Sequence, residues 1–223
     1  MREALIVWGG WSGHEPEHCA GIVRSMLEQE GFKVRVENTT EAFAAAGIAA
    51  MSLVVPIVTA SKIEKHQLES LCKAVRGGVG LAGFHGGMCD AFREATEYQF
   101  MCGGQWVAHP GNIIDYRVHV LRRDDPVMQG IDDFDYRSEQ YYMHVDPSND
   151  VLATTIFSGE HAAWIEGVVM PVVWKRRHGQ GRVFYSSLGH VAAEFEVAQM
   201  RTILRRGMAW AARSAQGFPG RSK

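Results

Sequence analysis

The sequence predicts an α/β protein with a mainly parallel β-sheet and some antiparallel strands in its C-terminal half. In the first hundred residues, continuous apolar runs of strand length alternate with amphipathic segments of helical spacing. Such alternation is typical of parallel strands that helices cover on both faces. In the second half, short apolar runs follow one another, and the stretch RRHGQG (residues 176–181) suits a hairpin connection.

The elements of the N-terminal half follow from apolar spacing and from residues that start or stop helices. Pro16 suits the first position of a helix, where its missing N–H costs nothing, and Gly31 suits the end of that helix. Pro56 cannot donate a ladder hydrogen bond, so it is expected near the end of its strand. In chain order, the predicted elements are the strand Ala4–Trp8, the helix from Pro16 to Gly31, the strand Lys33–Glu37, a short helix Glu41–Ala46 capped by Thr39 or Thr40, the strand Ser52–Val58, the helix Ile63–Arg76 and the strand Val79–Phe84.

The C-terminal half is predicted to contain short strands followed by one helix. This helix, Glu196–Ala212, has its apolar residues on one stripe. We find no internal repeat and no linker composition in the sequence, so we expect a single α/β domain over residues 1–213 and a disordered tail over residues 214–223. The predicted strands are Tyr116–Leu121, Val151–Thr155, Ala162–Ile165, Pro171–Lys175 and Arg182–Ser187.

The composition excludes several classes of partner. Hydrophobic residues make up 46% of the chain and the net charge is −2, so no nucleic-acid partner is expected. The longest apolar runs fall short of the roughly 18 residues of a membrane span, and the first residues do not resemble a signal peptide. We therefore expect no membrane association and a cytoplasmic location, where thiols stay reduced. Exposed edges or helices are compatible with a homodimer, which the sequence does not specify.

The stretch GLAGFHGGMCDAF (residues 80–92) predicts a strand, a tight glycine turn and a helix, with His85 at the apex of the turn. Because ligands of parallel sheets bind beyond the carboxyl ends of the strands, His85 is a candidate base, metal ligand or hydrogen-bond donor. A purely structural histidine is the alternative. Gly86 and Gly87 are expected to let the chain turn closely and a substrate approach. Cys89 begins the next helix, where a thiol pKa is usually lowered, but His85 holds the apex.

Two further histidines are expected at the same edge of the sheet. His14 lies in the loop after the first strand and His190 follows the last one, so with His85 they form a candidate set of ligands for a divalent metal such as zinc, which Glu139 would complete. The sequence has no HExxH spacing, so spacing alone does not establish a metal site. His109 precedes a proline and is therefore extended, either toward the same cleft or into solvent.

A carboxylate and two tyrosines lie together in the stretch SEQYYMHVDP (residues 138–147). Glu139 is a candidate acid/base or acceptor for hydroxyl groups, and Tyr141 and Tyr142 are candidate stacking surfaces for sugar rings. A tyrosine pair in the core and a glutamate on the surface would give the same pattern. The sequence contains no GxGxxG after the first strand and no GxxxxGK[ST], which argues against dinucleotide and P-loop sites.

Four stretches, in this order, resemble the ThuA-like, or trehalose utilisation, family: GLAGFHGG (80–87), EYQFMCGGQWVAHPGN (97–112), DPVMQGIDDFDYRSEQYYMHVDP (125–147) and PVVWKRRHGQGRVFYSSLGH (171–190). The resemblance extends from about Val7 to Trp210. It implies a flavodoxin-like three-layer sandwich of the class I glutamine amidotransferase type. In those amidotransferases a cysteine occupies the elbow that here holds His85, which argues against glutaminase chemistry.

The resemblance also implies a carbohydrate-related role, in the use of trehalose or another disaccharide, including 3-keto-glycosides. We expect a small-molecule carbohydrate ligand and either histidine-based acid/base chemistry or metal-assisted chemistry. By position, His85, His109, Glu139, His190 and the pair Tyr141 and Tyr142 match the family's motifs, and His14 matches a histidine of some members. We expect His85, His190 and Glu139 to be catalytic. The expected substrate-binding residues are His14, His109, Tyr141, Tyr142, Gly86 and Gly87. One alternative is a non-catalytic binding module that has lost the nucleophile, and another is a hydrolase that uses Cys89.

Overall fold

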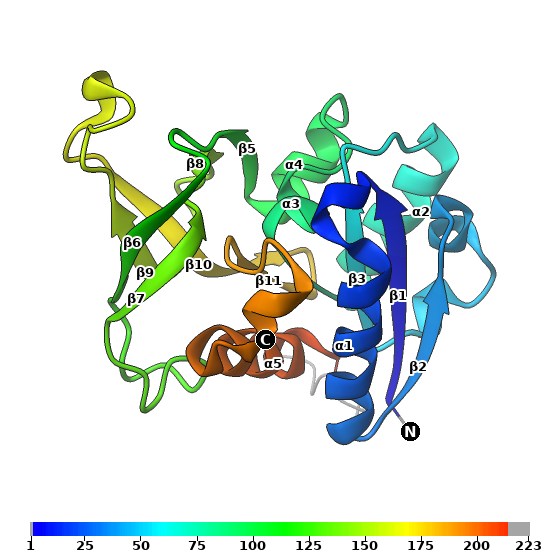
Figure 1. Cartoon of the computed structure of the whole chain (residues 1–223). Helices are drawn as coiled ribbons and strands as arrows, with labels where there is room; N and C mark the ends of the chain where they lie inside the picture. The colour runs from blue at the N-terminus through cyan, green and yellow to red at the C-terminus, as the bar shows by residue number, and fades with distance from the viewer. Residues whose placement is uncertain (1, 214–223) are drawn as a thin grey trace, which may run out of the picture.

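The computed structural model describes residues 2–213, and its centre is a nine-stranded sheet with the order β2-β1-β3-β4-β11-β10-β9-β6-β7 (Figure 1). The strands from β2 to β11 in this order are parallel, and those from β10 to β7 pair in the antiparallel sense. The prediction of a mainly parallel sheet with antiparallel strands in the C-terminal half is confirmed. The tail predicted over residues 214–223 lies outside the described residues.

The N-terminal half has the predicted alternation of strands and helices. α1 begins at Pro16, as expected, and α2 begins two residues later than predicted because Glu64 and Gln67 form a capping box there. In chain order, the elements are β1 (Arg2–Gly10), η1 (Ser12–His14), α1 (Pro16–Gln29), β2 (Phe32–Glu37), η2 (Thr40–Ala44), η3 (Ile48–Ala50), β3 (Leu53–Thr59), α2 (Lys65–Arg76), β4 (Gly80–Phe84), α3 (His85–Cys89) and α4 (Thr96–Cys102).

The C-terminal half continues the same sheet and adds a small one. β5 and β8 form a separate two-stranded antiparallel sheet, and β10 and β11 form the predicted hairpin, with His178 paired to Gly181 across the turn. The elements are β5 (Gly104–Ala108), β6 (Ile113–Val120), β7 (Phe134–Glu139), β8 (Tyr142–Val145), β9 (Asp150–Ile156), η4 (Ala163–Ile165), β10 (Val169–His178), β11 (Gly181–Ser186), η5 (Ala192–Glu196) and α5 (Ala198–Ala211).

Helices cover both faces of the parallel part of the sheet, so the molecule has three layers. Along β1, Ala4 and Ile6 pack in one core with residues of α1 and α5, while Leu5 and Val7 pack in a second core with residues of α2, α3 and α4. Both faces of the strand are therefore apolar, as its continuous apolar run predicts. The flavodoxin-like three-layer prediction is confirmed.

Two local predictions are wrong. The segment Ala162–Ile165 is not a strand: it lies in the loop between β9 and β10, where Ala162 N donates to Gly159 O and Ile165 N to Ala162 O in successive tight turns. Pro56 lies in the middle of β3, not near its end. On the other side from β1, the ladder between β3 and β4 ends at Val54, so the missing N–H of Pro56 costs no bond to β4.

The short helix predicted over Glu41–Ala46 is a 3-10 helix, η2, that ends two residues earlier. Thr39 caps it, since its hydroxyl accepts a hydrogen bond from the backbone N–H of Glu41. The last helix, α5, begins at Ala198, two residues after the predicted start, because η5 occupies the residues before it. β5, β7 and β8 are not among the predicted strands, because polar residues interrupt the apolar pattern of their sequences.

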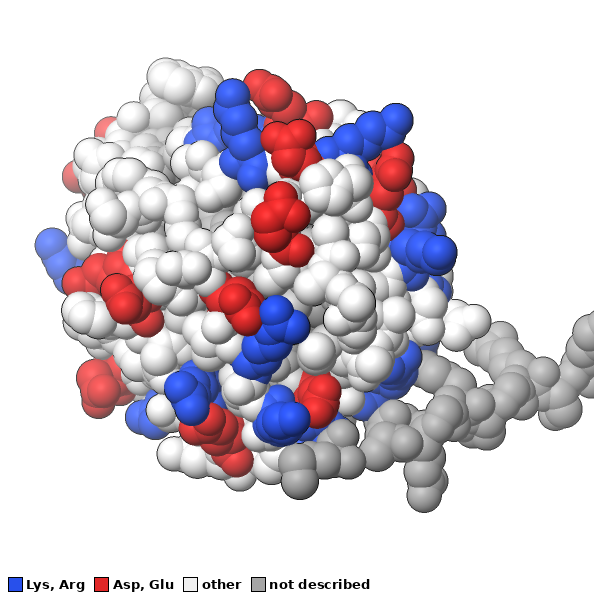
Figure 2. Space-filling model, turned by 90° about the vertical axis from the view of Figure 1, so that its right-hand side faces the viewer, with Lys and Arg blue, Asp and Glu red and all other residues white. Residues whose placement is uncertain are grey.

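The surface carries charges of both signs. On the face shown in Figure 2, which is the right-hand side of Figure 1, Lys and Arg side chains alternate with Asp and Glu. Several charged side chains of the molecule form exposed pairs, including Arg24 with Glu28 and Arg35 with Glu37. Within residues 2–213, we find no helix with the length and apolarity that crossing a membrane requires.

Candidate functional site

Four side chains from distant parts of the chain meet at the carboxyl edge of the parallel strands: His14, His85, Glu139 and His190. One ligand atom from each of the four lies within 4.8 Å of the others. His14 follows β1, His85 follows β4, and His190 follows β11, so three loops at one edge supply the imidazoles. Glu139 arrives from the antiparallel part, at the end of β7. The sequence brought these four residues together as candidates, and the structure places them in one cluster.

His85 occupies a strained turn directly after β4. Its φ of 47° lies in the left-handed region, which a residue with a side chain adopts only where the surrounding structure enforces it. Nδ1 of His85 donates to the backbone carbonyl of Ser187 (2.8 Å), and the Tyr185 hydroxyl donates to the carbonyl of His85 (3.0 Å). Because the Ser187 carbonyl can only accept, the unprotonated nitrogen of a neutral His85 is Nε2, which faces the cluster.

Thr59, the last residue of β3, orients the ring of His14. Its Nδ1 hydrogen-bonds to Thr59 Oγ1 (2.8 Å), so Nε2 is the nitrogen turned toward Glu139, 3.9 Å from Oε2. Burial, assisted by the charges of His85 and His190, lowers the pKa of His14 to about 3. The imidazole is therefore neutral at physiological pH and has a lone pair to offer.

Glu139 is the negative centre of the cluster. Its Oε2 lies 3.1 Å from Nε2 of His85 and 3.4 Å from Nδ1 of His190. Burial alone would raise the pKa of Glu139, but the hydrogen bonds and charges of His190 and His85 outweigh it and hold the pKa below its usual range. For His190, burial opposes protonation, and the hydrogen bond and charge of Glu139 outweigh burial and raise its pKa.

These donors fit a divalent transition metal. Three imidazole nitrogens and one carboxylate oxygen are a common ligand set for zinc and its neighbours in the first row. Nε2 of His85 also lies 3.2 Å from Nδ1 of His190 and 3.1 Å from Oε2 of Glu139. These three atoms carry few protons between them, so hydrogen bonds do not satisfy all of their lone pairs. A single cation would satisfy all of these lone pairs at once, and the outer nitrogens of His14 and His85 already have the second partners that metal-bound histidines need.

A second wall of the site is built by the small sheet. Nε2 of His109 lies 3.6 Å from the other Glu139 oxygen, Oε1, and the His109 side chain is 28% exposed, more than the four cluster residues. The Trp106 ring packs against that of His109, 5.3 Å between centroids, and Arg93 lies over Trp106. Trp106 Nε1 and His109 Nδ1 are buried and have no hydrogen-bond partner among the described residues.

The residues predicted to touch substrate occupy different positions. Tyr141 is buried and stacks on His85, with 4.1 Å between ring centroids, so it supports that ring from behind. Tyr142 packs on Phe157 instead. A Cβ on Gly86 would lie 2.7 Å from the His14 ring, and one on Gly87 would lie 3.0 Å from the Ile57 backbone. The two glycines therefore make room for protein, and their contact with a substrate remains a prediction.

Cys89 does not have the environment of a reactive thiol. It ends the short helix α3 instead of beginning one, and it is only 2% exposed. Burial, with the nearby Cys102, raises its pKa well above the usual value. The expectation of a lowered pKa is wrong, because burial disfavours the thiolate and outweighs the hydrogen bond from Tyr185 and the charge of Arg176.

Comparisons with known proteins show the family to which this chain belongs. Among protein families, the chain matches ThuA, described as trehalose utilisation, over residues 3–211. The chain belongs to the ThuA family. No curated protein matches this sequence.

Solved structures show how this ThuA protein is related in fold. The crystal structure of a ThuA-like protein from Parabacteroides merdae has a TM-score of 0.78 at 20% identity, covering 98% of this chain and 93% of that one. A ThuA-like protein from Bacteroides uniformis also has a TM-score of 0.78, at 16% identity, covering 94% and 91%. A cytoplasmic protein from Salmonella typhimurium has a TM-score of 0.66 at 11% identity, covering 95% and 100%. At these identities, the likeness concerns the fold.

Sequence reasoning missed the residues that hold the cluster of this ThuA protein in place. Glu194 accepts hydrogen bonds from the backbone N–H groups of Gly189 (3.2 Å) and His190 (2.9 Å) and from the Tyr136 hydroxyl, so it fixes the loop that presents His190. Glu15 accepts from the Ala192 N–H (3.0 Å) and ties this loop to the one after β1. Their only sequence signal is closeness to His190 and His14, which does not reveal contacts between separate loops.

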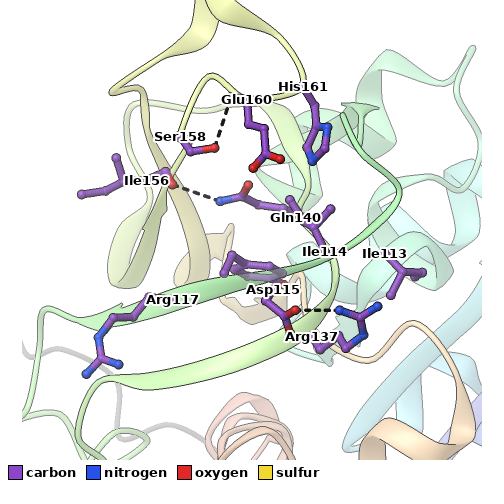
Figure 3. A pocket seen from close by; sticks show the side chains of 11 residues that line it. Ile113, Ile114, Asp115, Arg117, Arg137, Gln140, Ile156, Ser158, Glu160 and His161 are labelled. Atoms are coloured by element: carbon purple, nitrogen blue, oxygen red, sulfur yellow. Dashed lines mark hydrogen bonds and ion pairs between the residues drawn. The ribbon is translucent and has the colours of Figure 1, made fainter.

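A cavity of about 400 Å³ lies away from the cluster of the ThuA protein, between the start of β6, the end of β7 and the segment after β9 (Figure 3). Gln140 donates to the carbonyl of Ile156 on one side of it, and Arg137 pairs with Asp115 on the other. None of the four cluster residues lines this cavity. The histidine cluster and this cavity are therefore separate features.

Proposed function

We propose that this ThuA-family protein is a metal-dependent enzyme that cleaves 3-keto-glycosides derived from trehalose or a related disaccharide. The observation that supports this proposal most directly is the convergence of His14, His85, Glu139 and His190 on one point at the carboxyl edge of the sheet. The family description, trehalose utilisation, supplies the substrate class. The sequence left His85, His190 and Glu139 open as acid/base groups or ligands, and the proposal makes all three ligands.

The four residues would hold the metal, and a fifth would move the proton. A bound divalent cation supplies positive charge that polarises the 3-keto oxygen. His109 is then the group left to act as a base, because it lies beside Glu139, outside the ligand set, and is partly exposed. Its role is to take the proton from C2, the carbon next to the ketone.

The chemistry balances without another reactant. Removal of the C2 proton leaves an electron pair that forms the C1–C2 double bond as the bond from C1 to the glycosidic oxygen breaks. The departing oxygen takes up one proton, which His109 returns. A 3-keto-glycoside therefore gives an unsaturated keto sugar and a free alcohol, and subsequent addition of water at C1 would complete a hydrolysis.

The test measures turnover of 3-keto-trehalose together with metal content. We expect purified protein to contain a divalent metal, to lose activity with a chelator and to regain it with zinc or a similar ion. The double variant His85→Ala, His190→Ala should lose both metal and turnover. The matched control is His66→Ala, because His66 is exposed and lies on α2, away from the cluster.

Three outcomes would contradict parts of the proposal. Full activity of a metal-free sample would rule out a metal requirement. Unchanged turnover by the double variant would rule out the histidine cluster as the active site. Protein that neither turns over 3-keto-trehalose nor binds any sugar in a thermal-shift panel would favour the alternative, a non-catalytic module in which His85 replaces the amidotransferase cysteine.

We also propose a cytoplasmic location. The four cysteines, Cys19, Cys72, Cys89 and Cys102, are all buried and free, which suits a reducing compartment. One structural neighbour, from Salmonella typhimurium, is named a cytoplasmic protein. Cell fractionation tests this proposal, and size-exclusion chromatography with light scattering tests whether the chain forms the homodimer that its sequence allows.

A further inference from the structure

Trp11 is an exposed aromatic residue beside the histidine cluster, in the loop that joins β1 to η1. Its side chain is 52% exposed, although burying a tryptophan is strongly favourable. Its ring meets that of His14 edge to face, with 4.7 Å between centroids. An apolar ring surface therefore lies exposed to solvent in direct contact with His14, one of the candidate metal ligands.

The loop holds this ring in one place. The backbone N–H of Trp11 donates to the carbonyl of Thr59 (3.0 Å), and η1 closes behind it with Glu15 N donating to Ser12 O. The Trp11 ring lies over Gly13, where a Cβ would come within 2.4 Å of it. Gly13 thus provides the space that the indole needs, and the exposed ring is positioned by its surroundings.

Of the two tyrosines predicted as sugar platforms, Tyr141 is buried and Tyr142 lies against a residue outside the cluster. One face of Tyr141 is covered by His85, and the residue is 3% exposed. Tyr142 packs on Phe157. On the opposite wall, Arg93 covers Trp106. Among the aromatic residues of the described part of the chain that contact the cluster or His109, Trp11 is the one whose side chain is more than half exposed.

We infer that Trp11 is the platform on which a pyranose ring of the substrate stacks, next to the cluster. The C–H bonds on one face of a pyranose form an apolar, slightly positive surface, which complements the negative face of an indole. The inference rests on the proposed function and extends it, because it assigns the residue that recognises the sugar independently of the reacting ketone. It also makes the site selective for ring-shaped glycosides over short-chain keto compounds.

The experiment compares Trp11→Ala and Trp11→Phe with wild type, and uses Trp164→Ala as the matched control. Trp164 is 87% exposed and lies on η4, in the loop between β9 and β10. With 3-keto-trehalose, Trp11→Ala should raise KM roughly tenfold and change kcat less than about threefold, as expected for the loss of one aromatic contact. Trp11→Phe should restore most of the affinity, and Trp164→Ala should match wild type. The zinc content of all variants should be unchanged.

A second readout separates this inference from the proposed function. Trehalose binding to the zinc-loaded protein is measured by calorimetry, which requires no turnover; wild type should bind and Trp11→Ala should bind roughly tenfold more weakly. If wild type binds trehalose through Trp11 but does not turn over 3-keto-trehalose, the proposed reaction fails and the platform stands. If Trp11→Ala has wild-type KM and wild-type trehalose affinity, or if wild type binds no trehalose, the platform is overturned.

Discussion

Replacing Gly86 by alanine should weaken metal binding although none of the candidate ligands is itself replaced. An added Cβ would lie 2.7 Å from Cε1 of His14, 3.0 Å from its Nδ1 and 3.0 Å from the Thr59 methyl group. Carbon atoms in contact are normally about 3.5–4.0 Å apart, so the His14 ring would have to retreat by roughly 0.8 Å or more. Metal–ligand distances tolerate only about 0.2 Å.

The expected magnitudes follow from this displacement. We expect Gly86→Ala to lower zinc affinity by about 10- to 100-fold, as the loss of a supporting interaction around a ligand does. Crowding in a packed site should also cost about 1–3 kcal/mol of stability. The matched control is Gly21→Ala: Gly21 lies in the exposed middle of α1, and no atom lies within 4 Å of its added Cβ. That control should bind zinc normally and gain about 0.5–1 kcal/mol.

The assay is competition for zinc with a chromophoric chelator at fixed pH, combined with urea unfolding of the metal-free proteins. If Gly86→Ala folds poorly, Thr59→Val provides a second test, because it removes the hydrogen bond to His14 Nδ1 and leaves the volume nearly unchanged. It should weaken zinc binding about tenfold or more. Zinc affinity within threefold of wild type in a folded Gly86→Ala variant would refute the reasoning that His14 is a ligand.

The remaining predictions concern stability and reactivity. Folding lowers the pKa of His14 to about 3, so between pH 6.5 and 3 the unfolded chain binds a proton at His14 that the folded chain does not bind. The free energy of unfolding of metal-free protein should therefore fall by up to about 1.4 kcal/mol per pH unit as the pH is lowered from 6.5 toward 3. Urea titrations should show a shallower fall for His14→Gln and the wild-type slope for His66→Gln; equal slopes in all three would contradict the assignment. Iodoacetamide should label Cys89 far more slowly in native protein than in guanidinium, and rapid native labelling seen by mass spectrometry would restore it as a candidate nucleophile. Asp125→Asn should cost about 3–5 kcal/mol in urea unfolding, since it leaves the buried Lys175 ammonium without its partner, and a cost below 1 kcal/mol would show that this pair is effectively solvated.

The parallel half of the fold could be predicted because its elements are encoded locally. β1 is a continuous apolar strand, and α1 is an amphipathic helix that begins at Pro16. Both can be identified from the spacing of apolar residues within a short stretch of the chain. The position of Pro56 differs from the prediction because the cost of a proline depends on where the ladder to β4 stops, which is a property of the partner strand. The prediction for Ala162–Ile165 is wrong because a run of four apolar residues fits a turn as well as a strand.

In the candidate site, too, some features follow from local sequence and others depend on contacts between distant segments. Sequence patterns place His85 at the apex of a strand–helix turn, and His14 and His190 after other strands of the same sheet, because parallel strands have their carboxyl ends at one edge. Only tertiary contacts bring Glu139 to this edge from the antiparallel half and orient the imidazoles through Thr59 and the Ser187 carbonyl. They also bury Tyr141 while Trp11 stays exposed. The contacts that orient the imidazoles join segments 45 to more than 100 residues apart, and the spacing of residues along the chain does not predict such contacts.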